Sequence, residues 1–140
     1  LYRYRPPIDL ANARLRKLAA ALAPAHLRVS GTWANSTYFV DSDDAPGTPA
    51  SGFNGILTRR QWRGVVDFAR SVDARIVTSF AISPGTRDAA GVWQPDQADR
   101  LVSFTRSIGG RYRYRFESIP GGVSDSERGG RAGCASGFDR

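Results

Sequence analysis

The stretch richest in chemistry lies near the end of the sequence, where arginines alternate with tyrosines and a glutamate follows. It reads GGRYRYRFESIPGG over residues 109–122, and its glutamate is Glu117. Guanidinium groups bind phosphates and tyrosine rings stack on bases, so the alternation fits a strip that lies along a nucleic acid. A carboxylate at the end of a strand fits a general acid or base instead. The neighbouring elements must decide between these chemistries.

The other side chains that could react or bind a metal give weaker evidence of a functional site. Cys134 is the single cysteine, so the chain excludes an internal disulfide and a cysteine-cluster metal site. His26, the only histidine, is far from Cys134 in sequence, and we assign it a structural role. Asp41, Asp43 and Asp44 carry oxygen ligands of the kind that Ca²⁺ takes, but their segment lacks the glycine and terminal glutamate of a calcium loop. We therefore predict no metal and no cofactor, with these aspartates facing solvent.

The charge balance favours an anionic partner without identifying it. The 140 residues include 20 basic and 13 acidic side chains, a net charge of +7, and every basic residue except Lys17 is an arginine. The excess falls in separate stretches, which favours an arginine-rich surface over a nucleic-acid arm. No apolar run approaches the roughly 20 residues of a membrane-spanning helix. Because the sequence starts at Leu1 and contains no methionine, we expect the start of translation to precede it.

Hydrophobic periodicity predicts the elements that would position these side chains. Helical spacing of apolar residues predicts helices over 9–23, from Thr58 to about 72, and from Pro95 to 108. Alternating or continuous β-formers predict strands over 27–33, 74–83 and 111–117. The continuous run at 74–83 is typical of a strand covered on both faces. Residues 34–57 and 83–94 are predicted to be loops, and residues 121–140 an irregular tail.

The order of these elements predicts the fold class. Three alternations of helix and strand favour an α/β fold with a parallel sheet. Long connections follow the strands and short ones follow the helices, as in a (β/α)8 TIM barrel, whose active site lies on the loops after the strands. Three strands do not close a barrel of eight, which takes roughly 250 residues. The pattern therefore leaves either a small open sheet or a fragment.

Two long collinear stretches carry a family resemblance. They are YRPPIDLANARLRKLAAALAPAHLRVSGTWANSTYF at residues 4–39 and GILTRRQWRGVVDFARSVDARIVTSFAISPGTRDAAGVW at residues 55–93. Together they resemble the N-terminal part of the heparanase-like glycoside hydrolases, a family of endo- and exo-β-glucuronidases. The resemblance covers roughly residues 2–110 and is strongest over PAHLRVSGTWANSTYF.

The resemblance implies a fold and a reaction. The family has a (β/α)8 barrel with an added β-sandwich and cleaves glucuronide bonds with retention, using two glutamates. Retention needs two carboxyl groups about 5–5.5 Å apart, one as acid/base and one as nucleophile. The expected partner is an acidic glycan or glucuronide, and the resemblance favours a secreted or extracytoplasmic protein. Residues 1–120 would form an N-terminal barrel fragment of three βα units, and residues 121–140 an irregular tail.

On this resemblance, Glu117 falls in the acid/base position at the end of the fourth barrel strand. The family's Asn-Glu pair is absent there, and arginines occupy a strand that should be apolar. We therefore hypothesise that the chain leaves the family pattern after about Gly110, through a reading-frame error or a truncation. The nucleophile belongs to a later strand, so we expect this chain to be inactive by itself.

The resemblance and the strand ends also give four candidate substrate-binding residues. Thr32 matches the family's Gly-Thr at the sugar cleft, although a loop threonine that bonds its own backbone is the alternative. Trp33 and Asn35 follow on the same loop, where a tryptophan face suits a sugar ring or simply packs. Ser83 ends the next strand and Arg87 lies in its loop, where both could face an anionic glycan, and the alternatives there are a turn-capping serine and a solvated arginine.

A non-catalytic polyanion binder is the rival hypothesis. The motif YRYR occurs near both ends of the sequence, at residues 2–5 and 112–115. Such a module would use arginines for phosphates and tyrosines for base stacking. The collinear resemblance argues against it, so we expect no nucleic-acid partner and leave the oligomeric state open. Its candidate residues are Arg3, Arg5, Arg111, Arg113 and Arg115.

Overall fold

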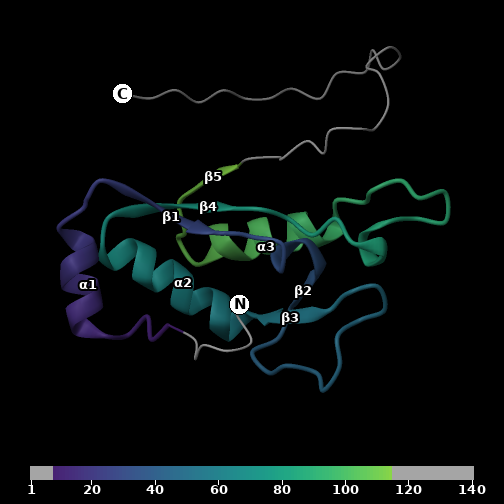
Figure 1. The fold of residues 1–140 in the computed structure, drawn as a ribbon, viewed down its shortest axis with the longest axis horizontal. Coiled ribbons are helices and arrows are strands. Elements are labelled where there is room, and N and C mark those ends of the chain that lie inside the picture. The colour runs from purple at the N-terminus through teal and green to yellow at the C-terminus, as the bar shows by residue number, and fades with distance from the viewer. Residues whose placement is uncertain (1–7, 115–140) are drawn as a thin grey trace, which may run out of the picture.

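The computed structural model describes residues 8–114 (Figure 1). Its mixed α/β composition confirms the predicted class, and within this range no helix is both long and apolar enough to cross a membrane. Glu117, Cys134 and the tail at 121–140 lie outside the described residues. The elements are α1 (Ala13–Ala20), β1 (Ala25–Val29), η2 (Ala34–Ser36), β2 (Thr37–Val40), β3 (Gly55–Thr58), α2 (Arg59–Ser71), β4 (Ala74–Thr78), η3 (Pro84–Thr86), α3 (Asp96–Ser107) and β5 (Tyr112–Tyr114).

The main sheet consists of three parallel strands in the order β1, β4, β5. Ala25 pairs with Ala74, and Ile76 pairs with Tyr112. The connection from β1 to β4 carries α2, and that from β4 to β5 carries α3, because parallel neighbours need a crossover. The parallel sheet is thus as predicted, although its strands are shorter. For example, β1 stops at Val29 because Gly31, with φ of 136°, turns the chain into η2.

The prediction that residues 34–57 are mostly loop holds for 41–54 and misses two short strands. Strands β2 and β3 lie in this segment and form a second parallel sheet, in which Thr37 pairs with Gly55 and Val40 with Thr58. Each strand has four residues, too few for its pattern to stand out among the surrounding Ser, Gly and Pro. The polar segment 41–54 that separates them also hid their pairing from sequence inspection.

The core lies between the main sheet and the helices α2 and α3, which cover the same face of the strands (Figure 1). The opposite face carries exposed side chains, including His26 and Arg75. The expectation that 74–83 is covered on both faces is therefore wrong for β4, where Ile76 is buried and Arg75 is exposed. The buried core cluster is Phe39, Trp62, Val66, Ala69, Ile76 and Leu101.

Helix α1 is shorter than the predicted helix over 9–23. The side chain of Asn12 accepts a hydrogen bond from the Leu15 N–H at 3.0 Å and so caps a helix that begins at Ala13. Residues before this cap form a separate turn, in which the Asp9 carbonyl accepts from the Asn12 N–H. Although the sequence pattern is amphipathic, α1 buries no residue, and Leu18 remains 62% exposed.

Helices α2 and α3 begin and end close to the predicted positions. Thr58 starts α2 with a capping box, in which its hydroxyl accepts from the Gln61 N–H while the Gln61 side chain accepts from the Thr58 N–H. Helix α3 begins directly after Pro95 and is followed by Gly109, whose φ of 74° ends it. These two helices supply most of the core opposite the main sheet.

Replacing Thr58 with alanine is expected to lower the free energy of unfolding by about 1 kcal/mol, because the first turn of α2 loses its cap. Urea unfolding followed by circular dichroism measures this change. Thr58→Ser is the matched control, since it removes the buried methyl group and keeps the capping hydroxyl. Equal destabilisation by both substitutions would show that packing of the methyl group, and not the cap, matters here.

Candidate functional site

The carboxyl ends of β1 and β4 bring the two predicted binding loops together. The Asn35 carbonyl accepts hydrogen bonds from the N–H groups of Ile82 and Ser83, at 2.9 and 3.0 Å. The loop after β1 is thereby fixed to the loop after β4. In parallel α/β sheets this edge is where ligands bind, because the loops there are free to vary while the strands hold them in place. We call it the carboxyl edge, defined by residues 30–36 and 79–86.

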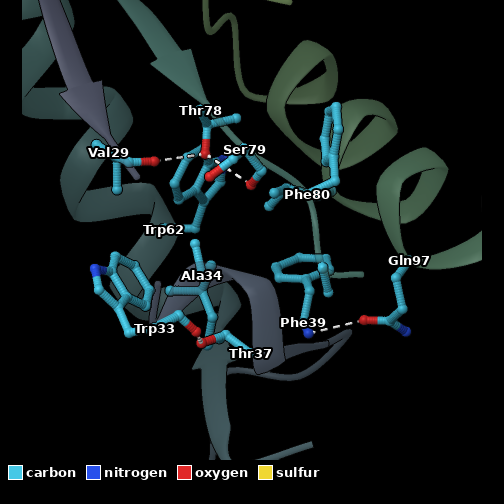
Figure 2. A pocket seen from close by; sticks show the side chains of 13 residues that line it. Val29, Trp33, Ala34, Thr37, Phe39, Trp62, Thr78, Ser79, Phe80 and Gln97 are labelled. Carbon is cyan, nitrogen blue, oxygen red and sulfur yellow. Dashed lines mark hydrogen bonds between the residues drawn. The ribbon is translucent and has the colours of Figure 1, made fainter. Parts of the chain in front are cut away.

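A small cavity lies beneath the carboxyl edge, between the strand ends and the helices (Figure 2). Its volume of about 30 Å³ leaves room for water and none for a sugar ring. Trp33 forms part of its wall and is half-buried, so part of the indole packs on the core side and part remains accessible. The lining residues are Val29, Trp33, Ala34, Thr37, Phe39, Leu57, Trp62, Thr78, Ser79, Phe80, Ala81, Gln97 and Leu101.

Polar side chains around this cavity hold the backbone in place. The Thr78 hydroxyl donates to the Val29 carbonyl at 2.8 Å, which ties β4 to the end of β1. The Gln97 side-chain oxygen accepts from the Phe39 N–H at 2.8 Å and so joins α3 to β2 (Figure 2). These bonds make the cavity a packing feature that supports the edge above it.

The four predicted binding residues lie at the carboxyl edge in different environments. Thr32 is exposed, and Trp33 and Asn35 are half-buried. Instead of its hydroxyl bonding its own loop, Thr32 contributes its carbonyl, which accepts from the Asn35 N–H at 3.3 Å. The Trp33 carbonyl similarly accepts from the Thr37 hydroxyl at 2.7 Å. The structure therefore brings the predicted residues together and leaves the Thr32 side chain accessible.

Ser83 is unusual among these residues. Its Oγ is the one buried side-chain oxygen or nitrogen within residues 8–114 that has no hydrogen-bond partner. The alternative of a turn-capping serine is therefore wrong, since η3 begins at Pro84 without a side-chain cap. Burying an unpaired hydroxyl is unfavourable, and such groups mark positions where a water molecule or ligand atom would complete the bond.

Sequence reasoning missed a larger cavity beside the carboxyl edge. It has a volume of about 260 Å³ and combines aromatic, amide and charged side chains. We call it the arginine cavity. Its residues come from β2, the loop before β3, η3 and α3, which only the unpredicted pairing of β2 with β3 brings together. They are Tyr38, Phe53, Gly85, Thr86, Arg87, Gln94, Asp96, Gln97 and Arg100.

The acidic segment after β2 is paired with α2. Asp41 forms an ion pair with Arg59 at 2.6 Å, and Asp44 forms one with Arg60 at 2.7 Å. Arg63 pairs similarly with Asp43 at 3.3 Å. The prediction that these aspartates face solvent is correct in that they are exposed, and the pairing explains their clustering. Within the described range no group of three or more His, Cys, Asp or Glu could hold a metal ion.

The residues of the rival polyanion hypothesis fall largely outside the described range. Arg3, Arg5 and Arg115 lie beyond it, as does Glu117. Arg111 is exposed and lines a cavity at the amino ends of the strands, on the opposite edge of the main sheet from the predicted binding residues.

No protein-family model matches the chain, and no curated protein matches it either.

Proposed function

We propose that this chain is part of the (β/α)8 catalytic barrel of a retaining glycoside hydrolase that cleaves β-glucuronide bonds in a uronic-acid-containing glycan. The observation that carries the proposal is the carboxyl edge. Thr32, Asn35 and Ser83, chosen from the sequence as substrate-binding residues, lie on two loops joined by hydrogen bonds at the ends of adjacent parallel strands.

The arrangement of the elements supports a segment of barrel wall. Strands β1, β4 and β5 follow one another in chain order as parallel neighbours, and each crossover packs a helix on the same face. In a barrel that face is the outer one, and substrate binds across the loops at the carboxyl ends. The second sheet, β2 and β3, is then an insertion in the loop after β1.

The proposed chemistry divides the work between this segment and later strands. Cleavage with retention needs a protonated carboxyl group at the leaving oxygen and an ionised one at the sugar carbon. The family resemblance puts the acid/base after β5 in the chain and the nucleophile on a later strand. This segment contributes hydroxyl and amide contacts, which hold the sugar so that its glycosidic bond lies between the two carboxyl groups.

The 140-residue chain is expected to leave an aryl β-glucuronide intact and still to bind a glucuronic-acid-containing oligosaccharide. Ser83→Ala should weaken that binding roughly tenfold, because the buried hydroxyl would reach the ligand through one bound water molecule and this hydrogen-bonded bridge is lost. The same substitution should raise the thermal midpoint slightly, since the Ser83 hydroxyl has no protein partner to lose and its burial without one is unfavourable. Isothermal titration calorimetry and thermal unfolding measure the two effects.

Ser103→Ala is the matched control, because Ser103 is exposed on α3 and its side chain makes no hydrogen bond within residues 8–114. Equal binding by the parent chain, the Ser83 variant and the Ser103 variant would sink the proposal. So would equal affinity for an uncharged glucan of the same length, or hydrolysis of the aryl glucuronide by the isolated chain.

A further inference from the structure

The arginine cavity has the size of a site for one ring and not for a chain. Its volume of about 260 Å³ lies just below the roughly 300–1,000 Å³ of typical ligand pockets. Gln97 lines both this cavity and the small one beneath the carboxyl edge, so the two are neighbours. A group bound here would contact Gly85, Thr86 and Arg87, which belong to the same loop as Ser83.

One cation in the cavity is held in place before any ligand arrives. The Arg87 guanidinium donates one bond from Nη1 to the Gly91 carbonyl at 2.8 Å. The loop that presents this carbonyl is itself fixed, because the Asp88 carboxylate accepts from the N–H groups of Ala90 and Val92, both at 2.9 Å. The remaining N–H donors of Arg87 are available at little further cost in entropy.

The second cation is unpaired. Arg100 is exposed on α3 and makes no hydrogen bond or ion pair with another residue of the described range 8–114. Asp96, one turn earlier on the same helix, lines the cavity but lies beyond ion-pair distance of Arg100. Two guanidinium groups therefore face one carboxylate, and the cavity carries a net positive charge that favours an anion.

The rest of the wall suits the face of a sugar ring. Tyr38 and Phe53 meet edge to face, with ring centroids 5.1 Å apart and an angle of 64° between the ring planes. They supply apolar surface against which the C–H face of a pyranose packs. The Gln97 oxygen is already bonded to the Phe39 N–H, so its amide N–H groups remain as donors toward the cavity.

We infer that the arginine cavity is a subsite for a hexuronic acid unit, which places its carboxylate between Arg87 and Arg100 and its ring against Tyr38 and Phe53. The saccharide part of this assignment rests on the proposed function, whereas the anion part rests on the two arginines alone. Asp96 opposes the bound carboxylate and limits the affinity, so its removal should act in the opposite direction to removal of Arg100.

The test is an NMR titration of the ¹⁵N-labelled 140-residue chain with glucuronic acid, glucose and acetate. Glucuronic acid should shift the amide signals of Tyr38, Thr86 and Gln97, and the other two compounds should bind at least roughly tenfold more weakly, because each offers only half of the contacts. Arg100→Gln should weaken glucuronic acid binding roughly tenfold. Asp96→Asn should tighten it about threefold, because a like charge is removed.

Arg14→Gln is the charge-matched control. Arg14 lies exposed on α1, at the opposite side of the molecule from β2 and β3 (Figure 1). Its substitution should leave glucuronic acid binding unchanged. If Arg100→Gln unfolds the chain, Asp96→Asn still tests the inference. Tighter glucuronic acid binding by this variant supports the inference, and unchanged or weaker binding contradicts it.

The outcomes separate this inference from the proposed function. Amide signal shifts confined to Thr32, Asn35 and Ser83 would overturn the assignment of the arginine cavity and leave the proposed function standing. The same follows if neither Arg100→Gln nor Asp96→Asn changes the affinity for glucuronic acid. If glucuronic acid does not bind at all, the assignment of the arginine cavity is also wrong. The proposed function is then tested separately, by the binding of the oligosaccharide. Binding in the cavity, combined with an oligosaccharide affinity that Ser83→Ala leaves unchanged, would keep the cavity and sink the proposed function.

Discussion

Trp62→Ala is expected to lower the free energy of unfolding by about 3–5 kcal/mol, which removes much of the total of roughly 5–15 kcal/mol for a typical domain. Trp62 is 1% exposed and belongs to the core cluster that joins α2 to β4 and α3. Alanine leaves a large cavity at this junction, and few neighbours can move into it, because β4 is held in the sheet on both sides.

A buried hydrogen bond adds to this effect. The indole Nε1 donates to the Thr105 hydroxyl at 2.6 Å, and that hydroxyl donates to the Leu101 carbonyl, also at 2.6 Å. Thr105 is 0% exposed, so Thr105→Val leaves the indole N–H buried without an acceptor and should cost about 1–3 kcal/mol. Trp62→Phe removes the same bond from the other side and keeps most of the ring.

Chemical denaturation followed by far-ultraviolet circular dichroism measures these changes. The effects of Trp62→Phe and Thr105→Val on the free energy of unfolding should be coupled. The double variant Trp62→Phe, Thr105→Val should cost less than the sum of its parts, because neither partner is then left unpaired. A loss below about 1 kcal/mol for Trp62→Ala would contradict the assignment of Trp62 to the centre of the core.

How well the sequence predicted the fold depended on whether the signals were local. Thr58 with Gln61 and Pro95 mark the starts of α2 and α3 through contacts within one helical turn, and both helices begin where expected. Leu18 and Leu22 fit a helical stripe equally well, yet both remain exposed on or beside α1. Periodicity predicts a face that can be buried, and only the tertiary arrangement determines whether it is.

The candidate site shows the same limit. Thr32 and Ser83 were found because each directly follows a predicted strand, and parallel strands bring such positions to one edge. Arg100 was missed, since its place in a cavity depends on Tyr38 in β2, and β2 was predicted to be loop. The unpaired state of Ser83 Oγ was also beyond sequence reasoning, because it results from the absence of an acceptor in the folded chain.

Gly52→Ala is expected to destabilise the chain by about 2–4 kcal/mol and to weaken hexuronic acid binding in the arginine cavity. Gly52 has a φ of 81°, and a Cβ atom there would overlap the Gly85 backbone, with its Cα only 2.6 Å away. The two glycines let the loop before β3 pack directly against η3, with Phe53 on one side and Arg87 on the other. If the alanine pushes the two loops apart, the aromatic side of the arginine cavity, formed by Tyr38 and Phe53, moves away from Arg87.

Two other glycines divide this effect into its causes. Gly109 has nearly the same φ, 74°, and a Cβ atom there would meet only the end of the Arg70 side chain, at an ordinary contact distance of 3.6 Å, so Gly109→Ala measures backbone strain alone, about 1–2 kcal/mol. Gly47 has neither a positive φ nor a close neighbour, so Gly47→Ala should leave both stability and binding unchanged. Thermal unfolding measures the stability of all three variants, and the glucuronic acid titration measures their affinity. If Gly52→Ala behaves as Gly109→Ala does in both measurements, the close packing of the two loops does not shape the cavity, because both variants then show only the backbone strain that the two positions share.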